Sequence, residues 1–155
     1  MQGSTLQSVA LLVARVTLGI IFFAHGAQKV FGWFGGYGIS GTYGYFQSIG
    51  APAVLAMAGV FVELIAAVLM FLGASTGLAA LLIIIQMLAA ILLLHGASGF
   101  FMNYYAWLPA GQEGYEFNIV LIGMALVLLL AGPGRYSVDA VKNLDFVRRA
   151  LGFRS

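Results

Sequence analysis

Four long apolar stretches, almost free of charge, constrain this chain more than any other feature. They cover approximately residues 6–27, 52–72, 77–97 and 116–131. A helix needs about 20 apolar residues to cross the hydrocarbon core of a bilayer, a length that the fourth stretch only approaches. Apolar residues make up 62% of the chain and charged residues 8%, too few to cover the surface of a soluble domain. We therefore expect an all-α integral membrane protein, a four-transmembrane-helix bundle surrounded by lipid.

The charged residues and the absence of cysteine exclude several other classes of protein. The net charge is only +2, and no basic stripe is present to contact phosphates, so we expect no nucleic-acid partner. Without cysteine the chain has no disulfide, no thiolate nucleophile and no Cys-ligated metal. The remaining candidate ligands lack the close spacing of a metal site, and we expect no bound metal.

Basic residues concentrate after the fourth apolar stretch and predict the orientation. Residues 133–155 hold Arg135, Lys142, Arg148, Arg149 and Arg154 against Asp139 and Asp145. The loop 28–50 has a single basic residue, and the loop 98–115 has none. Cytoplasmic segments of membrane proteins are enriched in Lys and Arg, so both termini are expected in the cytoplasm.

The chain is expected to divide into a transmembrane bundle, residues 1–134, and a cytoplasmic tail, residues 135–155. Ser137 is placed to cap a helix in the tail. Apolar residues then recur at helical spacing, with basic residues between them. This pattern predicts an amphipathic helix lying on the inner surface of the membrane.

Polar side chains inside the apolar stretches are the first candidates for function. Arg15, Glu63 and Gln86 each lie about nine or ten residues from the inner end of their helix, hence at similar depth. An ionised side chain in hydrocarbon is costly, so Arg15 and Glu63 are expected to pair. Two interpretations stay open: the pair fixes helix register, or it forms a polar site that relays protons.

One face of the first stretch combines glycines with basic side chains. Arg15 and Lys29 lie on this face with Gly19 and Gly26 between them, and His25 is one turn from Lys29. The pattern predicts a groove with a glycine floor that runs from the bilayer centre to the outer surface.

The two long loops are unusually aromatic. They contain both tryptophans, Trp33 and Trp107, and six of the seven tyrosines, among them Tyr37. Such residues either anchor a protein at the lipid headgroups or line a pocket for a flat, lipid-soluble ligand. The sequence leaves both alternatives open.

His25 and His95 lie at matched depth near the outer ends of the first and third stretches. Two such histidines raise the question of axial ligation of haem b. His95 projects about 180° away from Gln86 on a regular helix, so both face one pocket only if the helix turns or breaks. We regard haem b as disfavoured.

The ordered motifs of the chain resemble those of the DoxX family. They are Arg15, Gly19, His25-Gly26 and Lys29, then Gly50-Ala51-Pro52, then Glu63 before Leu72-Gly73, and finally Gly132-Pro133-Gly134-Arg135-Tyr136-Ser137-Val138-Asp139. The resemblance covers roughly residues 11–140. The family usually has Leu where this chain has Val138.

The resemblance implies a multi-pass protein of the bacterial cytoplasmic (inner) membrane. Relatives of the family include the quinone-linked subunit of thiosulfate:quinone oxidoreductase, and others are tied to redox stress. By that analogy Arg15, His25, Lys29 and Glu63 are the residues that the resemblance implies for the functional site.

The leading hypothesis is a quinone-binding subunit of a membrane oxidoreductase or redox-stress complex. Glu63 and Arg15 are the candidates for proton relay. The candidate quinone pocket consists of His25, Lys29, Trp33, Tyr37, Gln86 and His95. Since the chain lacks an electron carrier, a partner redox protein is expected to supply the electrons. The alternatives are a small transporter or channel subunit, which would act as a homo-oligomer, and a non-catalytic membrane assembly factor.

Overall fold

The computed structural model describes residues 4–109 and 112–142, and over these residues the chain is helical without strands. The long helices are α1 (Thr5–Phe31), α3 (Ala53–Leu72), α4 (Thr76–Ala90) and α5 (Glu116–Ala131). A shorter helix, α2 (Gly38–Ser48), follows the 3₁₀ turn η1 (Trp33–Gly35). A π-helical turn, η2 (Ile91–His95), and a 3₁₀ turn, η3 (Gly96–Ser98), extend α4.

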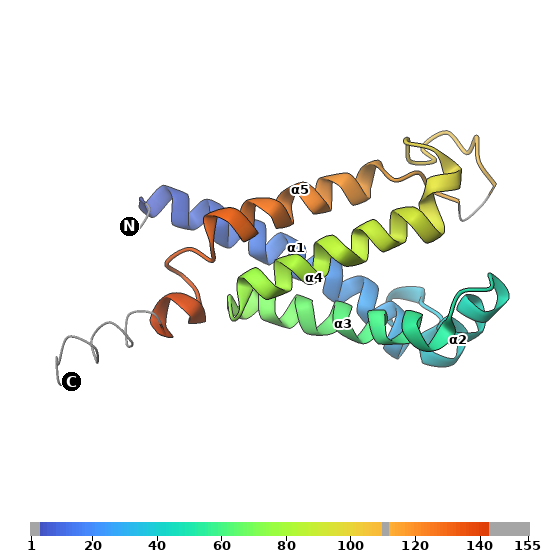
Figure 1. Cartoon of the computed structure of the whole chain (residues 1–155), viewed down its shortest axis with the longest axis horizontal. Helices are drawn as coiled ribbons and strands as arrows, with labels where there is room; N and C mark the ends of the chain where they lie inside the picture. The colour runs from blue at the N-terminus through green and yellow to red at the C-terminus, as the bar shows by residue number, and fades with distance from the viewer. Residues whose placement is uncertain (1–3, 110–111, 143–155) are drawn as a thin grey trace.

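The four long helices lie side by side along the long axis of the molecule (Figure 1). α1 packs against α3, and α4 packs against α5. One end of the bundle, which we call the terminal end, holds the start of α1 and residues 133–142. The other, the loop end, holds α2 and residues 96–109 and 112–115. The buried core between the helices includes Leu18, Phe22, Met70, Ile83 and Leu128.

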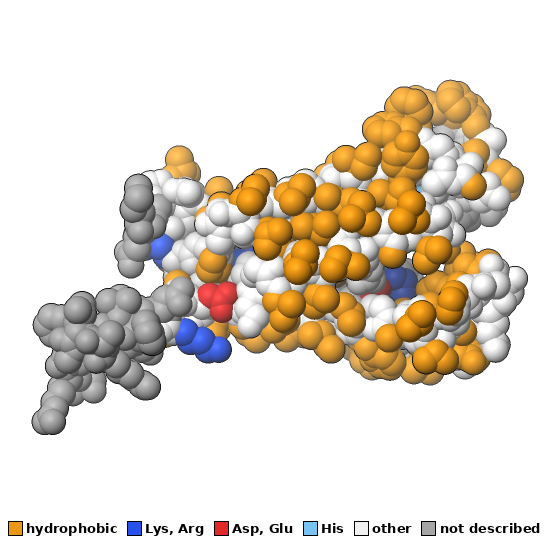
Figure 2. Space-filling view, viewed as in Figure 1, with side chains coloured by type: hydrophobic (Ala, Val, Ile, Leu, Met, Phe, Trp, Pro, Cys, Tyr) orange, Lys and Arg blue, Asp and Glu red, His pale blue; other side chains and the backbone are white. Residues whose placement is uncertain are grey.

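Three helical segments have the length and apolar composition needed to cross a membrane. They are Thr5–Phe31, Ala53–Leu72 and Thr76–Ser98, while α5 is shorter at 16 residues. Apolar side chains also cover most of the visible surface between the two ends (Figure 2). The described residues thus form an all-helical protein with membrane-spanning character.

The glycines of α1 bring this helix close to α3. A methyl group at Gly26 would lie 2.6 Å from a carbon of Leu64, and one at Gly19 would lie 3.0 Å from the ring of Phe71. The expectation of an open groove on this face is therefore wrong. Leu64 and Phe71 fill the space over the glycines, as small residues often permit between membrane helices.

The structure contains a helix, α2, where the sequence predicted an aromatic loop. Three glycines in residues 38–48 lower the intrinsic helix propensity of this segment. Packing against α1 and α3 compensates, and the buried Thr42 donates its hydroxyl proton to the carbonyl of Lys29 at 3.0 Å. Tertiary contacts therefore decide the conformation of this segment.

Arg15 is fully buried, but it does not pair with Glu63 as the sequence predicted. Its guanidinium donates to main-chain carbonyls at the terminal end: Met70 (3.0 Å), Phe71 (3.5 Å), Pro133 (3.0 Å) and Tyr136. The depth estimate failed because α1 begins beyond the turn that joins α3 to α4. With Gly19 against Phe71, Arg15 lies level with the carbonyl end of α3, where a positive charge is favourable.

Residues 133–142 fold against the same turn. Asp139 accepts hydrogen bonds from the backbone N–H groups of Ser75 (2.7 Å) and Thr76 (2.8 Å), and so caps α4 from a distant part of the chain. Ser137 accepts from the N–H of Ala140 at 3.1 Å, as its predicted capping role requires. The remainder of the predicted amphipathic tail, residues 143–155, lies outside the described residues.

Gly73 ends α3 with a φ of +62°, and two side chains pack against the position where a Cβ would lie. A Cβ at this position would collide with the Arg15 guanidinium and lie 2.5 Å from Ser137 Cβ. Gly50 offers a matched control, because it has a φ of +71° and open space around it. We expect Gly50→Ala to cost about 1–2 kcal/mol in the free energy of unfolding, from backbone strain alone. Gly73→Ala should cost clearly more in the same detergent unfolding titration, and equal losses would contradict the close packing.

The acid sensitivity of the terminal end should depend on Asp139. Burial raises the pKa of this carboxyl, but the N–H groups of Thr76 and Ser75 and the nearby Lys142 outweigh burial and hold the pKa below its usual value. The ionised cap therefore stabilises the fold above about pH 4, and this contribution is lost as the pH falls through the folded-state pKa. Asp139→Asn removes the charge and one of the two acceptor oxygens, and it should be less stable by about 1 kcal/mol at pH 7. The difference in the free energy of unfolding between the variant and wild type should be smaller at pH 3. An equal difference at both pH values would show that ionisation of Asp139 does not contribute.

Candidate functional site

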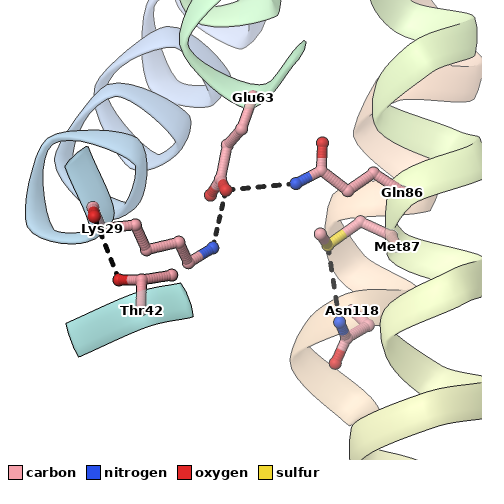
Figure 3. A network of polar contacts seen from close by, with 6 residues as sticks. All are labelled: Lys29, Thr42, Glu63, Gln86, Met87 and Asn118. Carbon is pink, nitrogen blue, oxygen red and sulfur yellow. Dashed lines mark hydrogen bonds and ion pairs between the residues drawn. The ribbon is translucent and has the colours of Figure 1, made fainter. Parts of the chain in front are cut away.

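Side chains from three helices meet in a polar cluster (Figure 3). Lys29 of α1 forms a salt bridge with Glu63 of α3, with 2.6 Å between Nζ and Oε2. Gln86 of α4 donates its amide N–H to the same carboxylate oxygen at 3.1 Å. We call Lys29, Glu63 and Gln86 the polar cluster. It ties α1, α3 and α4 together through a single carboxylate.

The pairing of α1 with α3 explains why Glu63 meets Lys29. Gly26 lies against Leu64, so Glu63 is level with the last turns of α1. Lys29 is in the last turn of that helix, and its long side chain reaches back to the carboxylate. The main chain at Lys29 is held in turn by Thr42 of α2. The helix that the sequence did not predict therefore supports the cluster.

A second polar contact lies close to the cluster (Figure 3). Asn118 of α5 is buried, and its amide N–H donates to the sulfur of Met87 at 3.4 Å. Met87 follows Gln86 on α4. Each of the four long helices thus contributes one polar side chain to this region. Asn118 was not among the residues predicted for the pocket.

The polar cluster is accessible from one side. Figure 2 shows a hollow at the loop end, between a lobe of α1, α2 and α3 and a lobe of α4 and α5, with basic and acidic side chains visible inside it. The Lys29 side chain is 34% exposed, whereas that of Glu63 is 3% exposed. The cation is therefore partly open to the hollow, and the carboxylate is buried beneath it.

His25 belongs to the same side of α1 as the polar cluster. It lies one turn before Lys29 on α1. Its side chain is exposed and forms none of the hydrogen bonds found among the described residues. His25 thus lies beside the cluster with its imidazole exposed.

Trp33 and Tyr37 do not line the polar cluster. The Trp33 ring packs against Phe23 and Phe31, with centroids 6.3 Å and 5.2 Å apart. Phe23 and His25 project about 160° apart around α1, so Trp33 covers the far side of the helix. Tyr37 is 82% exposed at the start of α2. These two candidate pocket walls therefore lie outside the cluster.

His95 is also separate from the cluster. The regular helix α4 changes to a π-helical turn at Ile91, and the Nδ1 atom of His95 lies 2.9 Å from the carbonyl oxygen of Glu113. Glu113 and Glu116 accept hydrogen bonds from backbone N–H groups of Asn103 and Met102, and so organise the loop. In the described part of the chain, no three His, Asp or Glu residues are grouped as a metal site would require.

Fold and site together define an α-helical membrane protein with a charged cluster enclosed between its helices. The DoxX family model matches residues 10–96, more than half of the chain, and this range contains the whole polar cluster. The chain belongs to the DoxX family.

A relative in Bacillus subtilis (strain 168) carries the name "Putative oxidoreductase CatD". It is 41% identical over 68 residues, which are 44% of this chain and 46% of the relative. The alignment thus spans less than half the length of that relative. No solved structure matches the chain.

Proposed function

We propose that this protein is the quinone-binding component of a membrane oxidoreductase. In this proposal α1, α3, the α4 segment and α5 all cross the bacterial inner membrane, with the terminal end in the cytoplasm. The loop end then faces outward, and the polar cluster lies within reach of molecules dissolved in the outer half of the bilayer. The excess of basic residues after α5 supports this orientation.

The observation that carries the proposal is the buried carboxylate of Glu63 beneath the partly exposed side chain of Lys29. A charge pair is costly among apolar helices, and such sites in membrane proteins commonly bind ligands or move protons. A quinone head is flat and lipid-soluble, and its oxygens need hydrogen-bond donors. Lys29 has two N–H groups beyond the one directed at Glu63, and His25 lies one turn away, so the donor set fits this group.

The protein's own residues would bind the ring and handle protons. A bound quinone supplies the electron-accepting chemistry. Glu63 is the group placed to hold or release a proton at the ring, because Lys29 and Gln86 position its carboxylate. The chain contains no cysteine for an iron–sulfur cluster, so the electrons are expected from a partner redox protein. The oxidoreductase name of the Bacillus subtilis relative supports this class of reaction.

The proposal is tested by purifying the protein in a mild detergent and measuring quinone in the lipid extract by mass spectrometry. Wild type should retain quinone well above the level found with an unrelated membrane protein purified in parallel. Lys29→Met and His25→Ala should lower the retained amount several-fold. The matched control is Lys142→Met, which removes a lysine at the terminal end and should retain quinone like wild type. If the wild-type extract contained no more quinone than the extract of the unrelated membrane protein, the proposal would be refuted.

A further inference from the structure

The polar cluster contains an acceptor without a donor. The side-chain oxygen of Gln86, Oε1, is shielded from solvent and has no hydrogen-bond partner among the described residues. The amide orientation is fixed, because the Gln86 N–H group must face the carboxylate of Glu63. A buried acceptor left unpaired is unfavourable, and such groups are rare in native proteins.

The carboxylate of Glu63 provides a second acceptor without a donor. Its Oε2 atom accepts both hydrogen bonds of the cluster, from Lys29 at 2.6 Å and from Gln86 at 3.1 Å. No donor from the described residues reaches the other carboxylate oxygen, Oε1. The cluster therefore offers N–H donors at Lys29 together with two unused oxygen acceptors, at Glu63 and Gln86.

We propose that the polar cluster prefers the reduced form of its ligand, a dihydroxy-aromatic quinol, over the oxidised quinone. This inference rests on the proposed function and specifies the form of ligand that the same site favours. A quinol hydroxyl both donates and accepts, so the hydroxyl that accepts from Lys29 can donate to Glu63 Oε1. A quinol hydroxyl can also donate to Gln86 Oε1.

A quinone carbonyl can pair with the donors of the cluster but not with its acceptors. It accepts from Lys29, but it has no proton to donate, so the oxygens of Gln86 and Glu63 stay unpaired in its complex. An unpaired buried acceptor costs enough to shift affinity by about tenfold or more. We expect the quinol to bind about tenfold more tightly than the quinone, with Gln86 responsible for part of the difference.

The test is a binding titration of the full chain in lipid nanodiscs under anaerobic conditions. The probes are decylubiquinone and menaquinone-2, each in its oxidised and its reduced form, with empty nanodiscs as the partition blank. Because the chain has no cysteine, a thiol reductant can keep the quinols reduced without altering the protein. Gln86→Met removes the amide at similar side-chain length, and the exposed Gln7→Met, at the terminal end of α1, makes the same exchange far from the cluster.

Each outcome has a distinct meaning. Tighter quinol binding by wild type and Gln7→Met, with a reduced preference in Gln86→Met, supports the inference. Equal binding of the two forms, or tighter quinone binding, overturns the inference while the proposed function stands. A preference that Gln86→Met retains in full overturns the role of this amide. Binding of neither form above the blank refutes the proposed function itself.

Discussion

Arg15→Met is expected to destabilise the protein by more than about 3 kcal/mol in the free energy of unfolding. The Arg15 side chain is fully buried, and its guanidinium is the donor for carbonyls on both α3 and the segment after α5. Methionine fills similar space but removes the guanidinium donor. The Met70 carbonyl keeps the N–H of Gly73, while the other carbonyls lose their partner. Each buried carbonyl left unpaired costs about 1–3 kcal/mol. The terminal end should therefore loosen first.

Two further variants separate charge from geometry. Arg15→Lys keeps the charge, but one ammonium cannot span carbonyls on two sides as the planar guanidinium does, so an intermediate loss is expected. Among the described residues, the exposed Arg135 donates only to Thr5, at 3.3 Å, so Arg135→Met should have little effect. The measurement is unfolding in a denaturing detergent followed by circular dichroism. Similar stability of Arg15→Met and Arg135→Met would contradict the role of Arg15 at the terminal end.

The second large effect concerns the salt bridge of the polar cluster. Lys29→Met leaves the carboxylate of Glu63, 3% exposed, without its countercharge, and a loss of about 3–5 kcal/mol is expected. Glu63→Leu should cost less, because the partly exposed Lys29 side chain can turn toward solvent. The double variant, Lys29→Met with Glu63→Leu, should recover most of the stability, since apolar replacement of a buried pair is often neutral or stabilising.

Ligand binding should not recover in the double variant. The helices of the double variant would pack, but its binding site would lack both charges. The amount of retained quinone is therefore expected to be several-fold below wild type in all three variants. Stability and retained quinone are measured on the same preparations. A double variant that folds well and still retains quinone at the wild-type level would show that the ion pair is purely structural.

The sequence predicted the helices better than the contacts between them. Apolar length and composition placed the long helices, because lipid requires each span to satisfy its own backbone hydrogen bonds. The α2 helix was missed because its glycines and aromatic residues are typical of a loop, and only packing against α1 and α3 makes it helical. Local propensity alone does not contain that information.

The candidate site was predicted in its residues but not in its pairing. Glu63, Lys29 and Gln86 were all candidates, yet the sequence paired Glu63 with Arg15. That error came from measuring depth from the start of α1, which extends past the turn between α3 and α4. Depths measured from the outer ends of the helices would have favoured the pairing of Glu63 with Lys29. Lys29 lies just before the aromatic loop, and a lysine side chain can reach inward. Asn118 gave no signal beyond its polarity.

The position of the ring is tested most directly with a photoreactive quinone analogue bound to the protein in nanodiscs. After illumination, mass spectrometry of the peptides identifies the labelled residues. If the polar cluster holds the ring, labels fall on α1 near His25 and Lys29 and on α4 near Gln86, and excess unlabelled quinone removes them. They should also be absent from the double variant of Lys29 and Glu63. Labels confined to the outward faces of the helices, unchanged in that variant, would contradict a quinone site in the bundle.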